Sequence, residues 1–99
     1  MSWHAGDTDP ALTGAATDGG VAVDLTPALS CLVHVKRPDG TLISRAPIVA
    51  VGTTGAWSLQ WQATELIEGE YSVELEVTWS TGHVQTFGPV SFPVEPQLA

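Results

Sequence analysis

A single alternating run constrains this chain more than any other feature. The segment from Glu68 to Gly82 reads EGEYSVELEVTWSTG, in which apolar and polar residues alternate almost without interruption. Successive side chains of a β-strand point to opposite faces of the sheet, so this strand has one apolar face and one polar face. The apolar set is Tyr71, Val73, Leu75, Val77 and Trp79, and the polar set is Ser72, Glu74, Glu76 and Thr78. The pattern predicts a long strand that covers one side of a hydrophobic core.

Turn signals divide the rest of the chain into short segments. Gly, Pro and Asp favour the backbone angles of tight turns, and they recur at 18–20, 38–40, 52–55, 68–69, 81–82 and 88–89. The β-branched and aromatic runs between them predict an all-β protein, an immunoglobulin-like antiparallel β-sandwich of about seven to eight strands. The expected strands are Leu12–Thr17, Val21–Leu25, Cys31–Arg37, Thr41–Val51, Ala56–Gln62, Tyr71–Ser80, His83–Phe87 and Val90–Val94.

One hydrophobic core follows from the alternation along these strands, because an antiparallel sheet commonly buries one face and leaves the other in water. The expected core members are Val33, Val35, Trp57, Leu59, Trp61, Tyr71, Val73, Leu75, Val77, Val90, Phe92 and Val94.

The length of 99 residues allows one small domain. We expect an N-terminal arm over 1–10, the β-sandwich over 11–95 and a C-terminal tail over 96–99. The first ten residues have neither the cationic start nor the apolar run of a secretory signal. The uncharged run from Ala46 to Thr64 contains Pro and Gly, so it predicts strands and turns, not a membrane span. We therefore expect a protein made in the cytoplasm and without membrane contact.

The charge is strongly negative and unevenly placed. The formal net charge is -8, and the three bases, Lys36, Arg37 and Arg45, stand close together in the sequence. Nucleic-acid binding needs an extended cationic face, so the sequence predicts no direct contact with nucleic acid. The charged fraction is 14%, against about 25% in soluble domains. Sparse charge favours a surface partly covered by other proteins; a surface rich in Thr, Ser and Gln is the alternative.

A search for reactive groups finds no catalytic or metal-binding pattern. The three histidines and Cys31 lack the close pairs of zinc sites, and Cys31 and His34 should leave opposite faces of their strand. Glu74 and Glu76 should share a face, roughly 6–7 Å apart by strand rise. Alternating glutamates on the solvent side of an amphipathic strand are ordinary, however, and do not by themselves indicate catalysis. The sequence predicts neither an enzyme, nor a metal site, nor a cofactor.

The tryptophans allow different interpretations. Trp57 and Trp61 flank Leu59 on one predicted face, where they would fill the core; exposed, they would be interface anchors. Trp3 stands beside His4 in the polar N-terminal arm. Its ring would pack either on its own domain or on a neighbouring protein.

Several segments together resemble a known family. They are VDLT from Val23 to Thr26, the PDG turn, TGAWSLQW, GEYSVELEVTWSTGHVQTF and the closing VSFPV. The chain, from about Asp7 to Glu95, is similar to the N-terminal domain of phage baseplate upper proteins and to small immunoglobulin-like virion proteins of tailed phages. The resemblance implies a β-sandwich that serves as a structural part of a phage particle. The chain stops where those baseplate proteins continue, so an adaptor for receptor-binding proteins is not implied.

We therefore expect a non-enzymatic structural protein of a tailed phage virion, in the tail or baseplate, the neck or on the capsid. Its partners would be other virion proteins, in a symmetric assembly of many copies. The expected interface residues are Trp3, His4, Lys36, Arg37 and Arg45, since a basic hairpin complements an acidic neighbouring copy. The alternative is a free-standing immunoglobulin-like module that binds carbohydrate or a cell surface. That module would need Trp57 or Trp61 exposed to solvent.

Overall fold

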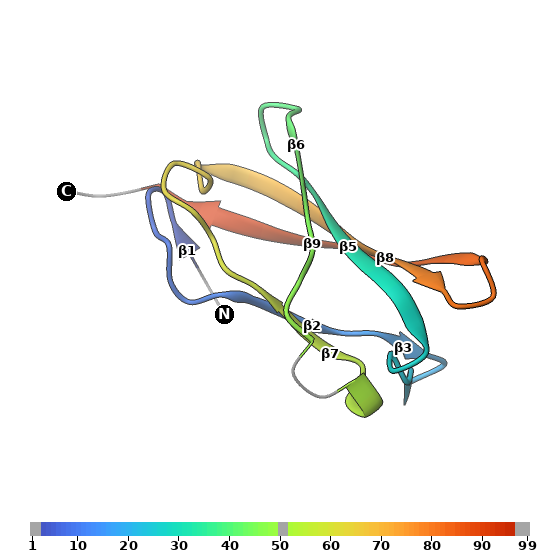
Figure 1. Ribbon diagram of the computed structural model, residues 1–99. Coiled ribbons are helices and arrows are strands. Elements are labelled where there is room, and N and C mark those ends of the chain that lie inside the picture. The colour runs from blue at the N-terminus through green and yellow to red at the C-terminus, as the bar shows by residue number, and fades with distance from the viewer. Residues whose placement is uncertain (1–2, 50–51, 97–99) are drawn as a thin grey trace.

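The computed structural model describes residues 3–49 and 52–96 and has the predicted all-β sandwich (Figure 1). Its elements, in chain order, are β1 (Trp3–His4), β2 (Leu12–Ala15), β3 (Thr17–Asp18), β4 (Val21–Ala22), β5 (Ala28–Lys36), β6 (Leu42–Arg45), the 3-10 helix η1 (Gly52–Thr54), β7 (Ala56–Leu59), β8 (Gly69–Trp79) and β9 (Val84–Glu95).

Two sheets of unequal size form the sandwich. The larger has the strand order β1-β9-β8-β5-β6, the smaller consists of β2 and β7, and β3 and β4 form a separate hairpin. The alternating segment of the sequence is β8, which lies at the centre of the larger sheet. Its neighbours β5 and β9 are antiparallel to it, whereas β1 is parallel to β9. A two-stranded sheet therefore has to cover the inner face of a five-stranded one.

The run predicted as a strand from Thr41 to Val51 is shorter in the structure. Strand β6 ends at Arg45, and Ile48 then forms an isolated bridge with Ser58 of β7 in the other sheet. Pro47 stands between the two pairings, and proline cannot donate a ladder hydrogen bond. The chain crosses from one sheet to the other at this proline. Residues 50–51 of the predicted strand lie outside the described residues.

The two strands predicted around Gly88 and Pro89 are one strand, β9. Its pairing with β8 shifts between Val73 and Leu75, where the single residue Glu74 of β8 faces two residues of β9, Gly88 and Pro89. Gly88 has a φ of 112°, a conformation that a side chain would strain. The glycine and proline therefore form a bulge inside a continuous strand, not a turn between two strands.

Most of the residues expected in the core are buried in the structure. Buried are Trp3, Leu12, Ala16, Leu25, Val33, Val35, Trp57, Leu59, Trp61, Leu66, Tyr71, Val73, Leu75, Val77 and Val94. One prediction is wrong and one holds in part. Val90 is 62% exposed, and Phe92 is half-buried and packs against the core cluster. Both point to the inner face of the sheet, as Val90 pairs with Val73 and Phe92 with Tyr71. Val90 is uncovered because the small sheet does not extend over the edge formed by β9.

Candidate functional site

Trp3 lies inside the domain. Its ring is 3% exposed and contacts Trp61 and Phe92 at centroid distances of 6.0 and 4.9 Å. The indole N–H donates to the Pro10 carbonyl oxygen at 2.6 Å. His4, its neighbour in β1, is exposed, and its backbone N–H donates to Asp7 Oδ2 at 2.9 Å. Of the two alternatives for the Trp3 ring, the structure shows the one in which it packs on its own domain.

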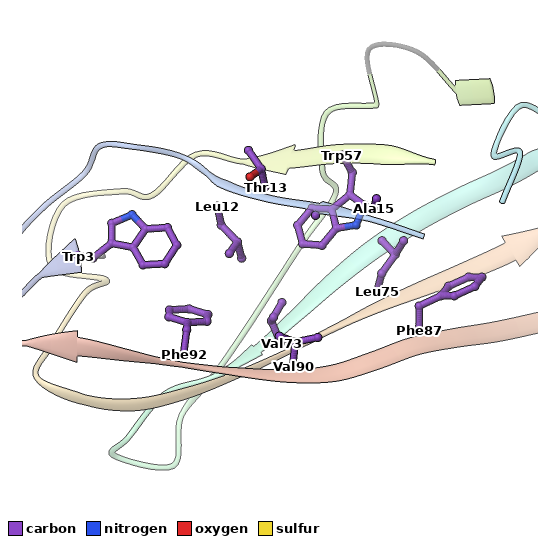
Figure 2. Close-up of a pocket in the computed structure, with 11 residues that line it drawn as sticks. Trp3, Leu12, Thr13, Ala15, Trp57, Val73, Leu75, Phe87, Val90 and Phe92 are labelled. Carbon is purple, nitrogen blue, oxygen red and sulfur yellow. The ribbon is translucent and has the colours of Figure 1, made fainter. Parts of the chain in front are cut away.

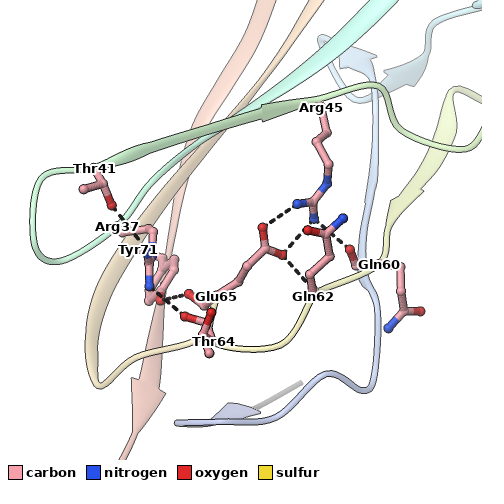
Figure 3. Close-up of polar contacts among 8 residues, drawn as sticks. All are labelled: Arg37, Thr41, Arg45, Gln60, Gln62, Thr64, Glu65 and Tyr71. Carbon is pink, nitrogen blue, oxygen red and sulfur yellow. Dashed lines mark hydrogen bonds and ion pairs between the residues drawn. The ribbon is translucent and has the colours of Figure 1, made fainter.

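The basic residues lie at the β5–β6 edge of the larger sheet, and two of them are held by their own chain (Figure 3). Arg45 forms an ion pair with Glu65 and also donates to the Gln60 carbonyl oxygen at 2.8 Å. Arg37 donates to the Thr64 carbonyl oxygen at 2.9 Å. Lys36 is exposed at the end of β5. The two arginines thus fasten the segment after β7 to the larger sheet.

Glu65 is the centre of this network. Burial alone would raise the pKa of its carboxyl group, but the hydrogen bonds from Arg45 and from the Gln62 N–H, with the arginine charge, outweigh burial and lower the pKa. Tyr71 secures the same segment, since its hydroxyl donates to the Glu65 carbonyl oxygen at 2.7 Å and accepts from the Ile67 N–H at 2.8 Å. Strand β7 ends at Leu59, before the predicted Gln62, where its pairing with β2 stops at Leu12.

The exposed aromatic platform required by the carbohydrate-binding alternative is absent at the two predicted positions. Trp57 is 9% exposed and Trp61 is 2% exposed. Trp61 contacts Trp3, Tyr71 and Phe92 in an aromatic cluster. Sugar-binding platforms need an accessible ring face, so these two rings do not form one.

An apolar cleft of about 310 Å³ opens between the two sheets, on the side where β2 and β9 are the edge strands (Figure 2). Trp3 closes one end, Trp57 and β2 form one wall, and β8 and β9 form the other. Its lining residues are Trp3, Leu12, Thr13, Gly14, Ala15, Trp57, Val73, Leu75, Phe87, Val90 and Phe92. No charged side chain is among them. The cleft is the place where the inner face of β9 lacks cover, which also accounts for the exposure of Val90.

Gly14 sets the position of the Trp57 ring. The two residues are paired across β2 and β7, and a Cβ at Gly14 would lie 2.4 Å from Trp57 Cζ2. Such contacts do not occur between real atoms, so the indole lies over β2 only because residue 14 has no side chain. Figure 2 shows the ring reaching from β7 into the space above β8 and β9. A glycine in the middle of a short strand therefore shapes one wall of the cleft.

The mouth of the cleft runs along a strand edge with few hydrogen-bond donors. Strand β1 pairs only with Val94 and Glu95 of β9, and the Glu95 carbonyl oxygen accepts from the Ala5 N–H at 2.8 Å. Backbone groups alternate between the two edges of a strand, so Ser91 and Pro93 face the same side as Glu95. Pro93 has no N–H. Between the bulge and β1, Ser91 alone offers an N–H to an additional strand.

Metal-binding side chains do not gather in the part of the chain that the structure describes. No group of three or more His, Cys, Asp and Glu residues there is placed to hold a metal ion. His34 contacts Ser44 Oγ at 2.8 Å and Glu76 at 3.6 Å on the outer face of the sheet, and His4 lies 3.9 Å from Asp7. Cys31 is half-buried, and burial raises the pKa of its thiol. Nor does any helix among the described residues have the length and apolar character to cross a membrane.

Sequence reasoning missed the cleft and the wall residues Leu12, Gly14 and Phe87. Gly14 was the available signal, since a glycine within the apolar segment LTGAA indicates the close approach of another group. The ring that approaches it comes from a strand more than forty residues further on, which the sequence does not indicate.

Fold and cleft together define a small β-sandwich that is open on one side. Among solved structures, the chain is similar to CopC from Methylosinus trichosporium OB3b, with a TM-score of 0.60 and 20% sequence identity, over 99% of this chain and 87% of that one. At this identity the likeness shows the fold alone. No family model and no curated protein matches the chain.

The expectation of a structural protein of a phage virion is wrong on these findings. The matching structure is that of CopC, and no phage protein is among the matches. The resemblance rested on hairpins and alternating strands, which β-sandwiches of different function share. The virion location and the virion partners were expected from the same resemblance, and both stay untested predictions.

Proposed function

We propose that this chain is a non-enzymatic binding protein that takes a small apolar molecule into the cleft between β2 and β9. The observation that carries this proposal is the cleft itself, about 310 Å³ in volume, with four aromatic rings in its lining and no charged group. Sites for small molecules are typically concave, mostly apolar and roughly 300–1,000 Å³ in volume. Contiguous apolar surface that is open to solvent often marks an interaction site or a ligand-binding groove.

The form of the cleft favours a compact molecule over an added peptide strand. Peptides that extend a sheet bind through backbone hydrogen bonds along a free edge. Here the prolines at 89 and 93 remove donors from β9, and β2 is only four residues long. An apolar molecule needs none of these bonds, because its affinity comes from the apolar surface that it and the cleft remove from water.

Binding of a metal ion such as copper has less support in this chain. The described histidines, His4, His34 and His83, lie on β1, in the middle of β5 and in the turn before β9, and no third donor completes a set around any of them. The described residues do not form a binding site for a copper ion, so the proposed function involves no copper.

A titration with α-methylstyrene, followed by NMR on methyl-labelled protein, tests the proposal. Methyl signals of Leu12, Val73, Leu75 and Val90 should shift on binding. Val90→Asp should weaken binding by about tenfold or more, because it places a carboxylate against the apolar ligand.

Val84→Asp is the matched control. Val84 is also on β9 and is 59% exposed, close to the 62% of Val90, but it does not line the cleft. Its substitution should leave the affinity within about twofold. The proposal fails if saturating α-methylstyrene leaves the cleft signals unchanged, or if the two aspartate variants lose affinity equally.

A further inference from the structure

The two tryptophans that line the cleft differ in their indole N–H groups. That of Trp3 donates to the Pro10 carbonyl oxygen. That of Trp57 has no acceptor among the described residues, although the side chain is more than nine-tenths buried. The N–H of Trp61 is also without an acceptor, but it is sealed inside the core, whereas that of Trp57 is not. Its Nε1 atom is among the ring atoms nearest to Gly14, so this free donor lies at the β2 wall of the cleft.

The surroundings of this donor restrict the acceptor that it would bind. The cleft lining carries no charge, and the chain as a whole has a net charge of -8. None of the three bases lines the cleft. Arg45 is paired with Glu65, Arg37 is bonded to the Thr64 carbonyl oxygen, and Lys36 is exposed at the end of β5. An anionic acceptor would lose its hydration without meeting a cation, so a neutral oxygen fits better.

We infer that the ligand is a neutral apolar molecule with a carbonyl-type oxygen, and that the Trp57 indole N–H donates a hydrogen bond to this oxygen. The inference rests on the proposed function and specifies its ligand class. The hydrogen bond fixes the orientation of the ligand, with its apolar part against Leu75, Val90 and Phe92. Trp57 thereby becomes a residue that determines specificity as well as part of the wall.

Acetophenone and α-methylstyrene form a suitable pair of probes, because they have nearly the same shape and differ in a C=O against a C=CH2 group. In ¹⁵N-labelled protein each of the four tryptophans gives one indole N–H signal, and Trp57→Phe assigns that of Trp57. Acetophenone should move the Trp57 indole proton downfield, as a new hydrogen bond does. With α-methylstyrene the same proton should show no downfield shift.

Trp57→Phe keeps an aromatic ring and removes the donor. Because the smaller ring also removes part of the cleft wall for both probes, it should weaken acetophenone about tenfold more than α-methylstyrene, the value of one hydrogen bond in a partly buried site. Trp79→Phe is the control, since the Trp79 indole N–H is already bonded to Gln85 Oε1 at 3.2 Å and Trp79 does not line the cleft. It should change neither affinity. Benzoate, an anion of similar shape, should bind at least about tenfold more weakly than acetophenone.

The outcomes separate the two proposals. If both neutral probes bind in the cleft but Trp57→Phe weakens them equally, or acetophenone leaves the Trp57 indole proton in place, the inference is overturned and the proposed function stands. If benzoate binds as tightly as acetophenone, the inference that the acceptor oxygen is neutral is overturned. If neither neutral probe binds, the proposed function fails and the inference fails with it. If Trp57→Phe does not fold, triple-resonance NMR on the wild-type protein assigns the Trp57 indole signal, and its shift still decides the matter.

Discussion

Gly14→Ala tests the packing that forms one wall of the cleft. Alanine in the interior of a strand is ordinarily favoured over glycine by about 0.5–1 kcal/mol, because glycine loses more backbone entropy on folding. Here the new Cβ would lie 2.4 Å from Trp57 Cζ2 and 2.7 Å from Cε2, so the ring or the strand must move. Overpacking of this kind costs about 1–3 kcal/mol. We expect a net destabilisation of up to roughly 2.5 kcal/mol from these two opposing terms.

The free energy of unfolding should be measured with urea and far-UV circular dichroism, which does not depend on the tryptophan signal. A double-mutant cycle with Trp57→Leu isolates the contact, because leucine removes the ring atoms that the new Cβ would meet. In the Trp57→Leu background, Gly14→Ala should be neutral or stabilising. If Gly14→Ala stabilises the otherwise unchanged protein, or costs the same in both backgrounds, the ring does not depend on the glycine and the account of this wall is wrong.

Two further predictions concern the network at Glu65 and the packing of Trp3. The pKa of Glu65 is lowered in the folded chain, so this group stabilises the fold above its ordinary pKa of 4.5 and the stabilisation is lost as the pH falls through the folded value. In urea titrations, the unfolding free energy should therefore fall less between pH 6 and pH 3 in Arg45→Met than in the unchanged protein. Lys36→Met should leave this fall unchanged. Equal pH profiles for the two variants would contradict the role of Arg45 in lowering the pKa of Glu65. Trp3→Ala should cost about 3–5 kcal/mol, since it removes a buried ring that contacts Trp61 and Phe92. His4→Ala, at the exposed position beside it, should change the unfolding free energy by less than about 0.5 kcal/mol, and a Trp3→Ala protein as stable as His4→Ala would refute the packing of the ring.

The sequence predicted the strands well and the cleft not at all, for one physical reason. Alternation along β8 shows which side chains share a face, and the burial of Tyr71, Val73, Leu75 and Val77 confirms it. Alternation does not show what covers that face. Val90 has the correct orientation and is nevertheless exposed, because cover depends on the size and position of the second sheet.

The charge pattern of the sequence also did not show which contacts the basic residues make. The sequence showed that Lys36, Arg37 and Arg45 stand close together, and a basic hairpin facing a neighbouring copy was a reasonable expectation. It could not show that Arg45 would pair with Glu65, twenty residues further along. The two residues meet because the segment after β7 folds back against β6. Whether the exposed Lys36 contacts another protein stays a prediction.

The parallel pairing of β1 with β9 has a consequence for the order of events during synthesis. Trp3 packs beside Val94, so the first strand finds its place only when the last strand exists. At usual rates of translation, about 90 residues take roughly 5–20 s to add. During that time the indole ring of Trp3 belongs to no core. Final closure of this domain must therefore follow the synthesis of β9, and a nascent chain halted before that strand would keep its N-terminal tryptophan accessible to chaperones.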